Sequence, residues 1–510
     1  MEESTVDTTL RKVAKGAGIF LFGTVFSLLI GLVTRVIVVR YLSKPDYGVL
    51  TLALTIFGIV QAVASFGIPL AMVRQFSYYS GKGDEERARA TVKIALYLII
   101  ALGLIWSVLL FLLSGFLAKT FRMPDLSWVL RLISFSIPFA LLNGYLVSLY
   151  QAFENARAKI IFNDFLLGFF RFLFVVLVIL AGLSFFGVVL AYVLAPVTTF
   201  MLFFLYSLKD LSKLRGIIHL KYVRELLFFS APLALQSILG MIITWTDVLM
   251  LGYFLTAKDV AVYGAARPIA NTLTTALVAA NFLYLPLASQ LFGRNKMEEI
   301  KRTYAVITKW ITAVTLPVFL VTFLFSKAVI WVLYGARYLD ASLILSILAL
   351  TFFIHVACGP NGMTLVIFGE NRFVTLATAI AAFINVILNV LLIPLFGVTG
   401  AAVATLITYF FSNMACSIKL FVRYSIHPFT KNYLKPIVIC FSVAIIISRC
   451  FSRVGLFGLI LLFVLFLIEY AIALIFTRSF DREDIMMLNA IEQKSGVNLE
   501  FVKKILKRFL

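Results

Sequence analysis

The sequence has few of the residues from which soluble catalytic and metal sites are built. It contains three histidines and four cysteines, and 14% of its residues are charged. The histidines (His219, His355 and His427) lie far apart, and no Cys/His or paired-carboxylate spacing predicts a metal site. A Gly-Lys-Ser/Thr phosphate-binding motif and a dinucleotide fingerprint are also missing. We therefore expect no ATP-driven transport by this chain alone, no enzyme, no metal and no cofactor.

Apolar residues dominate instead. They make up 62% of the chain, and the mean hydropathy is +1.03. They form runs of roughly 20 residues, the length that a helix needs to cross a bilayer. This pattern predicts an all-α integral membrane protein with about fourteen transmembrane helices. We expect these spans over residues 15–40, 46–73, 91–118, 126–152, 159–182, 185–207, 226–252, 258–289, 303–325, 339–368, 373–395, 398–422, 432–450 and 455–477.

The second half of the chain repeats the first. LSKPDYGVLTLA from Leu42 matches LTAKDVAVYGAA from Leu255, and NGYLVSLYQAFENAR from Asn143 matches NGMTLVIFGENR from Asn361. The repeat predicts two six-helix lobes and two C-terminal helices, and such bundles usually keep a substrate pathway between their lobes. We place the N-lobe at 1–207, a cytoplasmic linker at 208–225, the C-lobe at 226–422, the two additional spans at 423–477 and a cytoplasmic amphipathic tail at 478–510.

The net charge of +21 is distributed unevenly between the two sides of the predicted membrane protein. Of the 45 Lys and Arg residues, 32 lie near the termini and the loops on their side, 10 lie near the opposite loops, and three lie within spans. An excess of Lys and Arg marks the cytoplasmic side of a membrane protein. We therefore expect both termini in the cytoplasm and contact with membrane lipids, and no binding of nucleic acid.

Charged residues within the spans are candidates for function, because a charge at the bilayer centre costs about 2.5–3.5 kcal/mol. Arg35 and Asp247 lie at nearly equivalent places in the repeat, and Arg267 follows in the next span. Asp247 is a candidate coupling group or charge partner. Asp164 precedes Arg171 by two helical turns, and this spacing fits a structural ion pair as well as a site.

Polar side chains in the same spans fall on single helix faces. These faces should turn toward other helices or toward a water-filled cavity. The candidates for the cavity lining are Thr24, Ser27, Thr55, Asn271 and Asn281.

Two inner turns also carry matching charges. Glu154 with Arg157 and Glu370 with Arg372 fit salt bridges, with gating contacts as the alternative.

Three segments carry a family likeness that extends over roughly residues 10–478 in order and spacing. They are KGAGIFLFGTVFSLLIGLVTRVIVVRYLSKPDYGVLTLA, FSAPLALQSILGMIITWTDVLMLGYFLTAKDVAVYGAA, and IFGENRF with NVILNVLLIPLFGVTGAAVAT. The sequence resembles Wzx-type polysaccharide and oligosaccharide flippases of the multidrug/oligosaccharidyl-lipid/polysaccharide exporter superfamily. By span, Arg35, Arg74 and Arg267 are the nearest counterparts of the arginines that receive the pyrophosphate in the related lipid II flippase.

The resemblance implies alternating access that moves a polyprenyl-(pyro)phosphate-linked oligosaccharide from the cytoplasmic to the outer leaflet. It also implies a prokaryotic plasma membrane, H+ or Na+ as a coupling ion, and glycan-assembly proteins as partners of a monomer. The main alternative is a cation-coupled small-molecule or drug exporter of the multidrug and toxin extrusion (MATE) type, whose cationic substrates require a carboxylate-lined cavity. A membrane glycan polymerase or ligase is the third reading, although the chain has no long outer loop with Arg and His.

Overall fold

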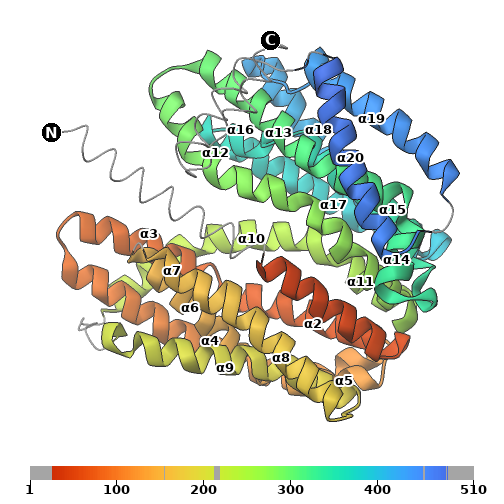
Figure 1. The fold of residues 1–510 in the computed structure, drawn as a ribbon. Helices are drawn as coiled ribbons and strands as arrows, with labels where there is room; N and C mark the ends of the chain where they lie inside the picture. Colours follow the sequence, from red (N-terminus) through yellow and green to blue (C-terminus); the bar gives the residue numbers. More distant parts are fainter. Residues whose placement is uncertain (1–25, 154, 212–218, 452–453, 478, 480–510) are drawn as a thin grey trace. The chain divides into compact units, whose positions relative to one another are not determined.

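Long apolar helices make up almost all of the structure (Figure 1). The computed structural model describes residues 26–153, 155–211, 219–451, 454–477 and 479, and these residues form helices and no strand. Within them, 12 helices are long and apolar enough to cross a membrane, or up to 13 spans if a bent pair counts as one. The expectation of an all-α membrane protein is confirmed.

The chain forms two compact units, residues 1–264 and 265–510. The first contains a helix over 26–41, α2 (Lys44–Ser65), α3 (Ile68–Gly81), α4 (Glu85–Thr120), α5 (Asp125–Ser134), α6 (Ile137–Ala152), α7 (Ala156–Ala158), the π-helix η1 (Lys159–Leu166), α8 (Leu167–Leu180), α9 (Phe185–Leu211), α10 (Leu220–Phe254) and the start of α11 (Ala257–Asn271). The second continues with η2 (Thr272–Thr274), α12 (Thr275–Gly293), α13 (Met297–Leu324), α14 (Ser326–Tyr334), η3 (Ala336–Tyr338), α15 (Ala341–Ala357), α16 (Asn361–Ile367), α17 (Asn371–Phe396), α18 (Val398–Tyr424), α19 (Lys431–Cys450) and α20 (Leu456–Phe476).

The helices follow the apolar runs of the sequence closely. Every span expected after residue 41 coincides with one of these long helices or with the bent pair α5 and α6. The expected first span begins outside the described residues, so the total of fourteen stays a prediction, as does the amphipathic tail, which lies outside them except for Ser479. The unit boundary at 264 differs from the predicted lobe boundaries because α10 packs on α2, α3 and α4. The lobes defined by the repeat stay a prediction.

Helices end inside two predicted spans where the sequence carries Pro and Gly. α5 and α6 meet at an angle of 44°, and α6 begins with Pro138 in its first turn. α15 ends before Gly359, whose φ of +67° suits glycine and few other residues. A Cβ atom on Gly359 would also overlap the side chain of Thr308 on α13. Pro138 and Gly359 therefore mark interruptions of these two spans.

The internal repeat is visible in the hydrogen bonds that begin equivalent helices. The Ser43 hydroxyl donates to Asp46 Oδ2 over 2.6 Å at the start of α2, and the Thr256 hydroxyl donates to Asp259 Oδ2 over 2.6 Å at the start of α11. In both turns a hydroxyl and an acid three residues apart occupy the first turn of a helix, as in a capping box. The repeat that matches Leu42 with Leu255, 213 residues later, therefore relates two similar local structures.

The repeated Asn-Gly motifs also make similar contacts. Asn143 Nδ2 donates to the Pro196 carbonyl over 2.9 Å, across 53 residues of sequence. Asn361 Nδ2 donates to the Asn413 carbonyl over 3.1 Å, across 52 residues. Each asparagine thus joins a short helix of its own unit to a long one, α6 to α9 and α16 to α18.

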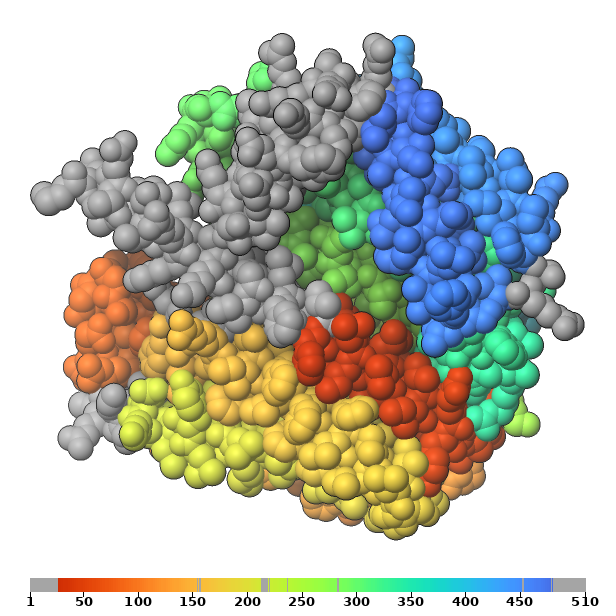
Figure 2. Space-filling model, viewed as in Figure 1, coloured from red at the N-terminus to blue at the C-terminus, as the bar shows by residue number. Residues whose placement is uncertain are grey.

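Large apolar side chains point outward along the spans. On α20, Phe457 is 81% exposed and Phe476 is 83% exposed. Figure 2 shows α19 and α20 as the blue surface of the second unit. Apolar exposure on this scale is expected for a surface that faces lipid.

Close packing of α2 against the start of α11 generates the first prediction. A Cβ atom on Gly48 would overlap the backbone carbonyl of Ala257. Gly48→Ala should therefore lower the free energy of unfolding by about 1–3 kcal/mol, the usual result of overpacking. Thermal unfolding of the purified protein, followed by tryptophan fluorescence, measures the change.

The matched control is Gly115→Ala in α4, where a Cβ atom would meet nothing within 4 Å. Alanine is the better helix former, so this variant should unfold at the wild-type temperature or slightly above it. Equal unfolding temperatures for the two variants would contradict the packing argument.

Candidate functional site

The first helix (residues 26–41) lies alongside α8, as the red and gold surfaces in Figure 2 show. Phe26 stacks on Phe165 of η1 with ring centroids 4.8 Å apart, and the Tyr41 hydroxyl donates to the Leu183 carbonyl just after α8 over 2.7 Å. Gly168 lies between these contacts, where a Cβ atom would be 3.0 Å from Ile30 Cγ2. The two helices therefore stay close along most of their length.

Each of these two spans carries an arginine, Arg35 on the first helix and Arg171 on α8. Arg35 and Arg171 are half-buried and lie within electrostatic reach of each other. The Arg171 guanidinium lies over the ring of Tyr192 on α9, with Cζ 5.2 Å from the ring centroid. Tyr47 of α2 is buried, lies in the field of Arg35 and Tyr192, and donates its hydroxyl to the Gly264 carbonyl over 3.1 Å. A cationic cluster with two tyrosines thus lies inside the first unit.

Asp164 and Arg171 do not form the ion pair that their spacing suggested. Asp164 Oδ1 accepts a hydrogen bond of 2.8 Å from Asn163 Nδ2, and the structure joins neither oxygen to Arg171. Seven residues of helix correspond to an axial distance of about 10 Å, which is too long for a direct contact. Arg171 Nε is buried and has no hydrogen-bond partner in the described part of the chain.

Asp247 on α10 is fully buried and is held by a tyrosine. The Tyr263 hydroxyl, also fully buried, donates to Asp247 Oδ2 over 2.6 Å. Sequence reasoning identified the acid and missed this tyrosine. The repeat gives no signal for it, because Tyr263 aligns with Leu50 in the matching segment of α2.

The other two candidate phosphate ligands have different surroundings. Arg74 on α3 is exposed, and its guanidinium lies over the Phe229 ring of α10, 4.3 Å from the centroid. Arg267 on α11 is half-buried and belongs to the second unit.

The expected polar lining is only partly buried. Ser27 is half-buried, whereas Thr55 is buried and donates to the Thr51 carbonyl over 2.8 Å. Asn271 is exposed, and Asn281 has a buried side-chain oxygen without a hydrogen-bond partner among the described residues. Thr24 lies outside the described residues.

The inner-turn charges pair differently from the expectation. Glu370 forms ion pairs with Arg423 and with Lys419, 3.9 Å away, both on α18. The expected partner Arg372 is exposed beside it on α17, because the helix that starts at Asn371 turns its side chain outward. Arg157 is exposed, and its expected partner Glu154 lies outside the described residues.

Sequence reasoning also missed two charged residues of the second unit. Lys309 on α13 is 6% exposed and donates to the Ser479 carbonyl over 3.3 Å, beside a cavity of about 210 Å³ that Arg302 and Tyr433 also line. Glu469 on α20 has two buried oxygens without a hydrogen-bond partner among the described residues. Its position as the one acid in the apolar run 455–477 was a signal that could have identified it.

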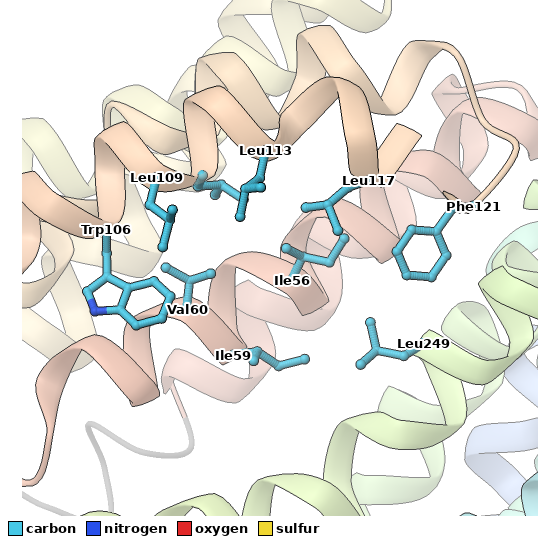
Figure 3. A pocket seen from close by; sticks show the side chains of 10 residues that line it. Ile56, Ile59, Val60, Trp106, Leu109, Leu113, Leu117, Phe121 and Leu249 are labelled. Atoms are coloured by element: carbon cyan, nitrogen blue, oxygen red, sulfur yellow. The ribbon is translucent and has the colours of Figure 1, made fainter. Parts of the chain in front are cut away.

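An apolar cavity of about 270 Å³ lies in the first unit between α2, α4 and α10. Figure 3 shows Trp106, Leu113 and Phe121 facing Val60 and Leu249 across it. Its lining residues carry no charge, so this cavity cannot bind a phosphate through ionic contacts. The cationic cluster of Arg35 and Arg171 is the better candidate for a polar ligand in this unit.

Comparison of the sequence with known proteins agrees with this architecture. Residues 13–292, more than half of the chain, match the family described as "Polysaccharide biosynthesis protein", and residues 232–391 match the MatE family. The chain is 28% identical over 388 residues to the probable low-salt glycan biosynthesis flippase Agl15 of Haloferax volcanii. The aligned region covers 72% of this chain and 75% of that protein.

Solved structures share the fold at low sequence identity. An inward-closed lipid II flippase MurJ matches with a TM-score of 0.68 at 17% identity, over 90% of this chain and 98% of that one. An inward-facing multidrug resistance MATE family transporter matches with a TM-score of 0.68 at 15% identity, over 78% and 94% of the two chains. These two structures show that the fold is shared, and the two family matches with the similarity to Agl15 confirm the expected resemblance to the multidrug/oligosaccharidyl-lipid/polysaccharide exporter superfamily. This multi-pass membrane protein belongs to the polysaccharide biosynthesis protein family.

Proposed function

We propose that this protein is a flippase that moves a polyprenyl-(pyro)phosphate-linked oligosaccharide from the cytoplasmic to the outer leaflet of a prokaryotic plasma membrane. The observation that carries the proposal is the positive interior of the first unit, where Arg35 and Arg171 lie within spans and pair with no carboxylate of the described residues. Guanidinium groups stay charged and bind phosphate oxygens in a fork geometry. Membership of the family and the similarity to Agl15, a probable glycan biosynthesis flippase, support the same class of substrate.

In the proposed mechanism, the saccharide headgroup and its phosphate enter a cavity that opens to the cytoplasm while the polyprenyl tail stays in lipid. Arg35 and Arg267 bind the phosphate, and Arg74 at the cytoplasmic end of its span meets it first. The cavity then closes on the cytoplasmic side and opens outward. Neutralising the phosphate lowers the cost of bringing it into a medium of low dielectric constant, which is the main barrier to crossing.

Asp247 is proposed to couple this cycle to an ion. A buried carboxylate can take up H+ or Na+, and uptake of either ion neutralises its negative charge. Tyr263 fixes the orientation of Asp247 Oδ2 through its 2.6 Å hydrogen bond. Binding of the ion to one conformation would then bias the return step.

A drug exporter of the MATE type is the second candidate, because residues 232–391 match that family. Its cationic substrates would be repelled by the arginines within the spans of the first unit, so the electrostatics of this unit favour the flippase. Complementation of a strain that lacks its glycan flippase, beside a drug-efflux assay, separates the two. Efflux without complementation would overturn the proposed function.

Charge reversal tests the proposed phosphate contacts. Arg35→Glu and Arg267→Glu should each reduce flipping by about tenfold or more, since a lost hydrogen bond to a charged group costs about 1.5–3 kcal/mol. The measurement is protection of a fluorescent lipid-linked saccharide in proteoliposomes that contain the full-length variant.

Arg122→Glu is the matched control, because Arg122 is exposed in the turn between α4 and α5. This variant should flip at the wild-type rate. Normal flipping by both Arg35→Glu and Arg267→Glu, at wild-type levels of folded protein, would refute the assignment.

Asp247→Asn tests the coupling role. We expect binding of the substrate to persist and the flipping rate to stop responding to an imposed H+ or Na+ gradient, because an amide cannot take up either ion. Flipping rates in proteoliposomes with each gradient in turn measure this response. A gradient response equal to that of the wild type would exclude Asp247 as the coupling group.

A further inference from the structure

We infer that His355 is a proton-binding residue of the second unit, and that proton uptake at its Nε2 atom is relayed through Asn413 to the broken span between α15 and α16. This role goes beyond the proposed function, because no step of that mechanism uses His355. It is also independent of the substrate that the protein transports.

A hydrogen-bond network connects His355 to the break in its span. His355 lies on α15, one helical turn before Gly359. Its Nδ1 atom lies 3.0 Å from Asn413 Oδ1 on α18. Asn361 begins α16, and its Nδ2 atom donates to the Asn413 carbonyl over 3.1 Å and to Asn413 Oδ1 over 3.4 Å. The buried Asn413 therefore connects the imidazole ring before the break to the first residue of the helix after it.

The contacts of Asn413 determine which ring nitrogen of His355 carries the proton. Asn413 Nδ2 donates to the Tyr409 carbonyl over 2.7 Å, and a carbonyl oxygen can only accept. Asn413 Oδ1 is therefore the atom that faces His355, so the neutral ring donates from Nδ1 and has its lone pair on Nε2. Among the described residues, no hydrogen bond involves Nε2. This nitrogen is therefore available to accept a proton.

The helices around His355 bring no carboxylate to its ring. His355 lies between Phe353, which stacks on Phe319 of α13, and Gly359, which meets Thr308 of the same helix. η2 carries no titratable side chain, and the titratable groups on the packed parts of α13, α18 and α14 are Lys309, Tyr409, Cys416, Lys327 and Tyr334. In the described part of the chain no acid forms an ion pair with His355, so no negative charge holds the ring in its protonated form.

The first unit has a similar joint without a histidine. Asn143 joins α6 to α9 as Asn361 joins α16 to α18. The residue six positions before Asn361 is His355, and the residue six positions before Asn143 is Ile137, which is fully buried. An apolar side chain therefore suits this place in the repeat. A structural role alone does not explain a residue that changes its charge between about pH 5 and 8.

Proton uptake redistributes the hydrogen bonds of this network. A hydrogen bond from an imidazolium is about twice as strong as one from a neutral ring. Asn413 Oδ1 is then held more strongly by His355 Nδ1 and is less available to Asn361 Nδ2. The contact between α16 and α18 becomes weaker at Asn361, so acidification loosens the start of α16.

His355→Asn separates proton binding from hydrogen bonding. The amide nitrogen of asparagine is attached to Cγ, as Nδ1 is in histidine, so this variant keeps the donor to Asn413 and lacks Nε2. We expect it to fold and to lose the response to pH. A structural role for His355 predicts that His355→Asn behaves as the wild type at every pH.

Protonation is measured by ¹⁵N NMR of the full-length protein in lipid bilayers, with labelled histidine. At pH 8 we expect the His355 ring to carry its proton on Nδ1, and at pH 5 on both nitrogens. The double variant His219→Asn/His427→Asn leaves His355 as the only labelled ring and does not change its network. A His355 ring that stays neutral down to pH 4.5, or that carries its proton on Nε2 at pH 8, would overturn the inference.

The relay is measured by hydrogen exchange of residues 361–367 at pH 5 and pH 8, after correction for the intrinsic effect of pH. Amides at the start of α16 should exchange about fivefold faster at pH 5 in the wild type, as expected for the loss of one hydrogen bond. His355→Asn should show no such change. Equal acceleration in the wild type and in His355→Asn would exclude the relay.

His427→Asn is the matched control. His427 is exposed in the turn before α19 and lies against the Phe421 ring, with centroids 5.4 Å apart, much as His355 lies against the Tyr409 ring at 5.5 Å. This variant should keep the wild-type acceleration at pH 5. Loss of the acceleration in His427→Asn would assign the response to pH to the wrong histidine and refute the role of His355.

Neither measurement requires the substrate, so the two proposals can fail separately. If Nε2 takes up a proton but the wild type flips no lipid-linked saccharide, the role of His355 stands and the proposed function fails. If the wild type flips the saccharide and Nε2 takes up no proton, the proposed function stands and the role of His355 fails.

Discussion

Lipid offers neither hydrogen bonds nor counter-ions, and this property of the surroundings shapes every level of the structure. Backbone groups must be satisfied within each segment, so the described spans are helices. Where a helix is interrupted, the protein itself fills the gap. The break before α16 is covered by Thr308 of α13, and Asn361 beside it bonds to α18.

The same constraint explains why the repeat is preserved at its turns and joints. Helix starts need acceptors for their free N–H groups. The Asp46 N–H donates to Ser43 Oγ at the start of α2, and the Thr256 N–H donates to Asp259 Oδ2 at the start of α11. Asn143 and Asn361 join short helices to long ones through backbone carbonyls. Charged residues inside the spans do not follow the repeat, and they are where the proposed function lies.

In the first unit the protein holds charge in two different ways. Asp247 is fully buried and receives a hydrogen bond from Tyr263, so this carboxylate is oriented by its own unit. Arg35 and Arg171 are half-buried, and among the described residues no carboxylate forms an ion pair with either. A cation that protein does not neutralise is suited to a ligand that brings its own charge. The uncompensated positive charge of the two arginines would favour binding of a phosphate by the proposed flippase. The apolar cavity in Figure 3 has no such charge.

The sequence by itself determined the helices, because membrane-length apolar runs leave a chain few alternatives in lipid. Through the repeated motifs and the quoted segments it also revealed the resemblance to the family. Only the tertiary structure decided which charges meet. Spacing along the chain suggested Asp164 for Arg171 and Arg372 for Glu370, whereas packing between helices placed Tyr192 of α9 against Arg171 and α18 beside Glu370. Side chains from different spans come together through close helix contacts, and a linear pattern does not contain that information.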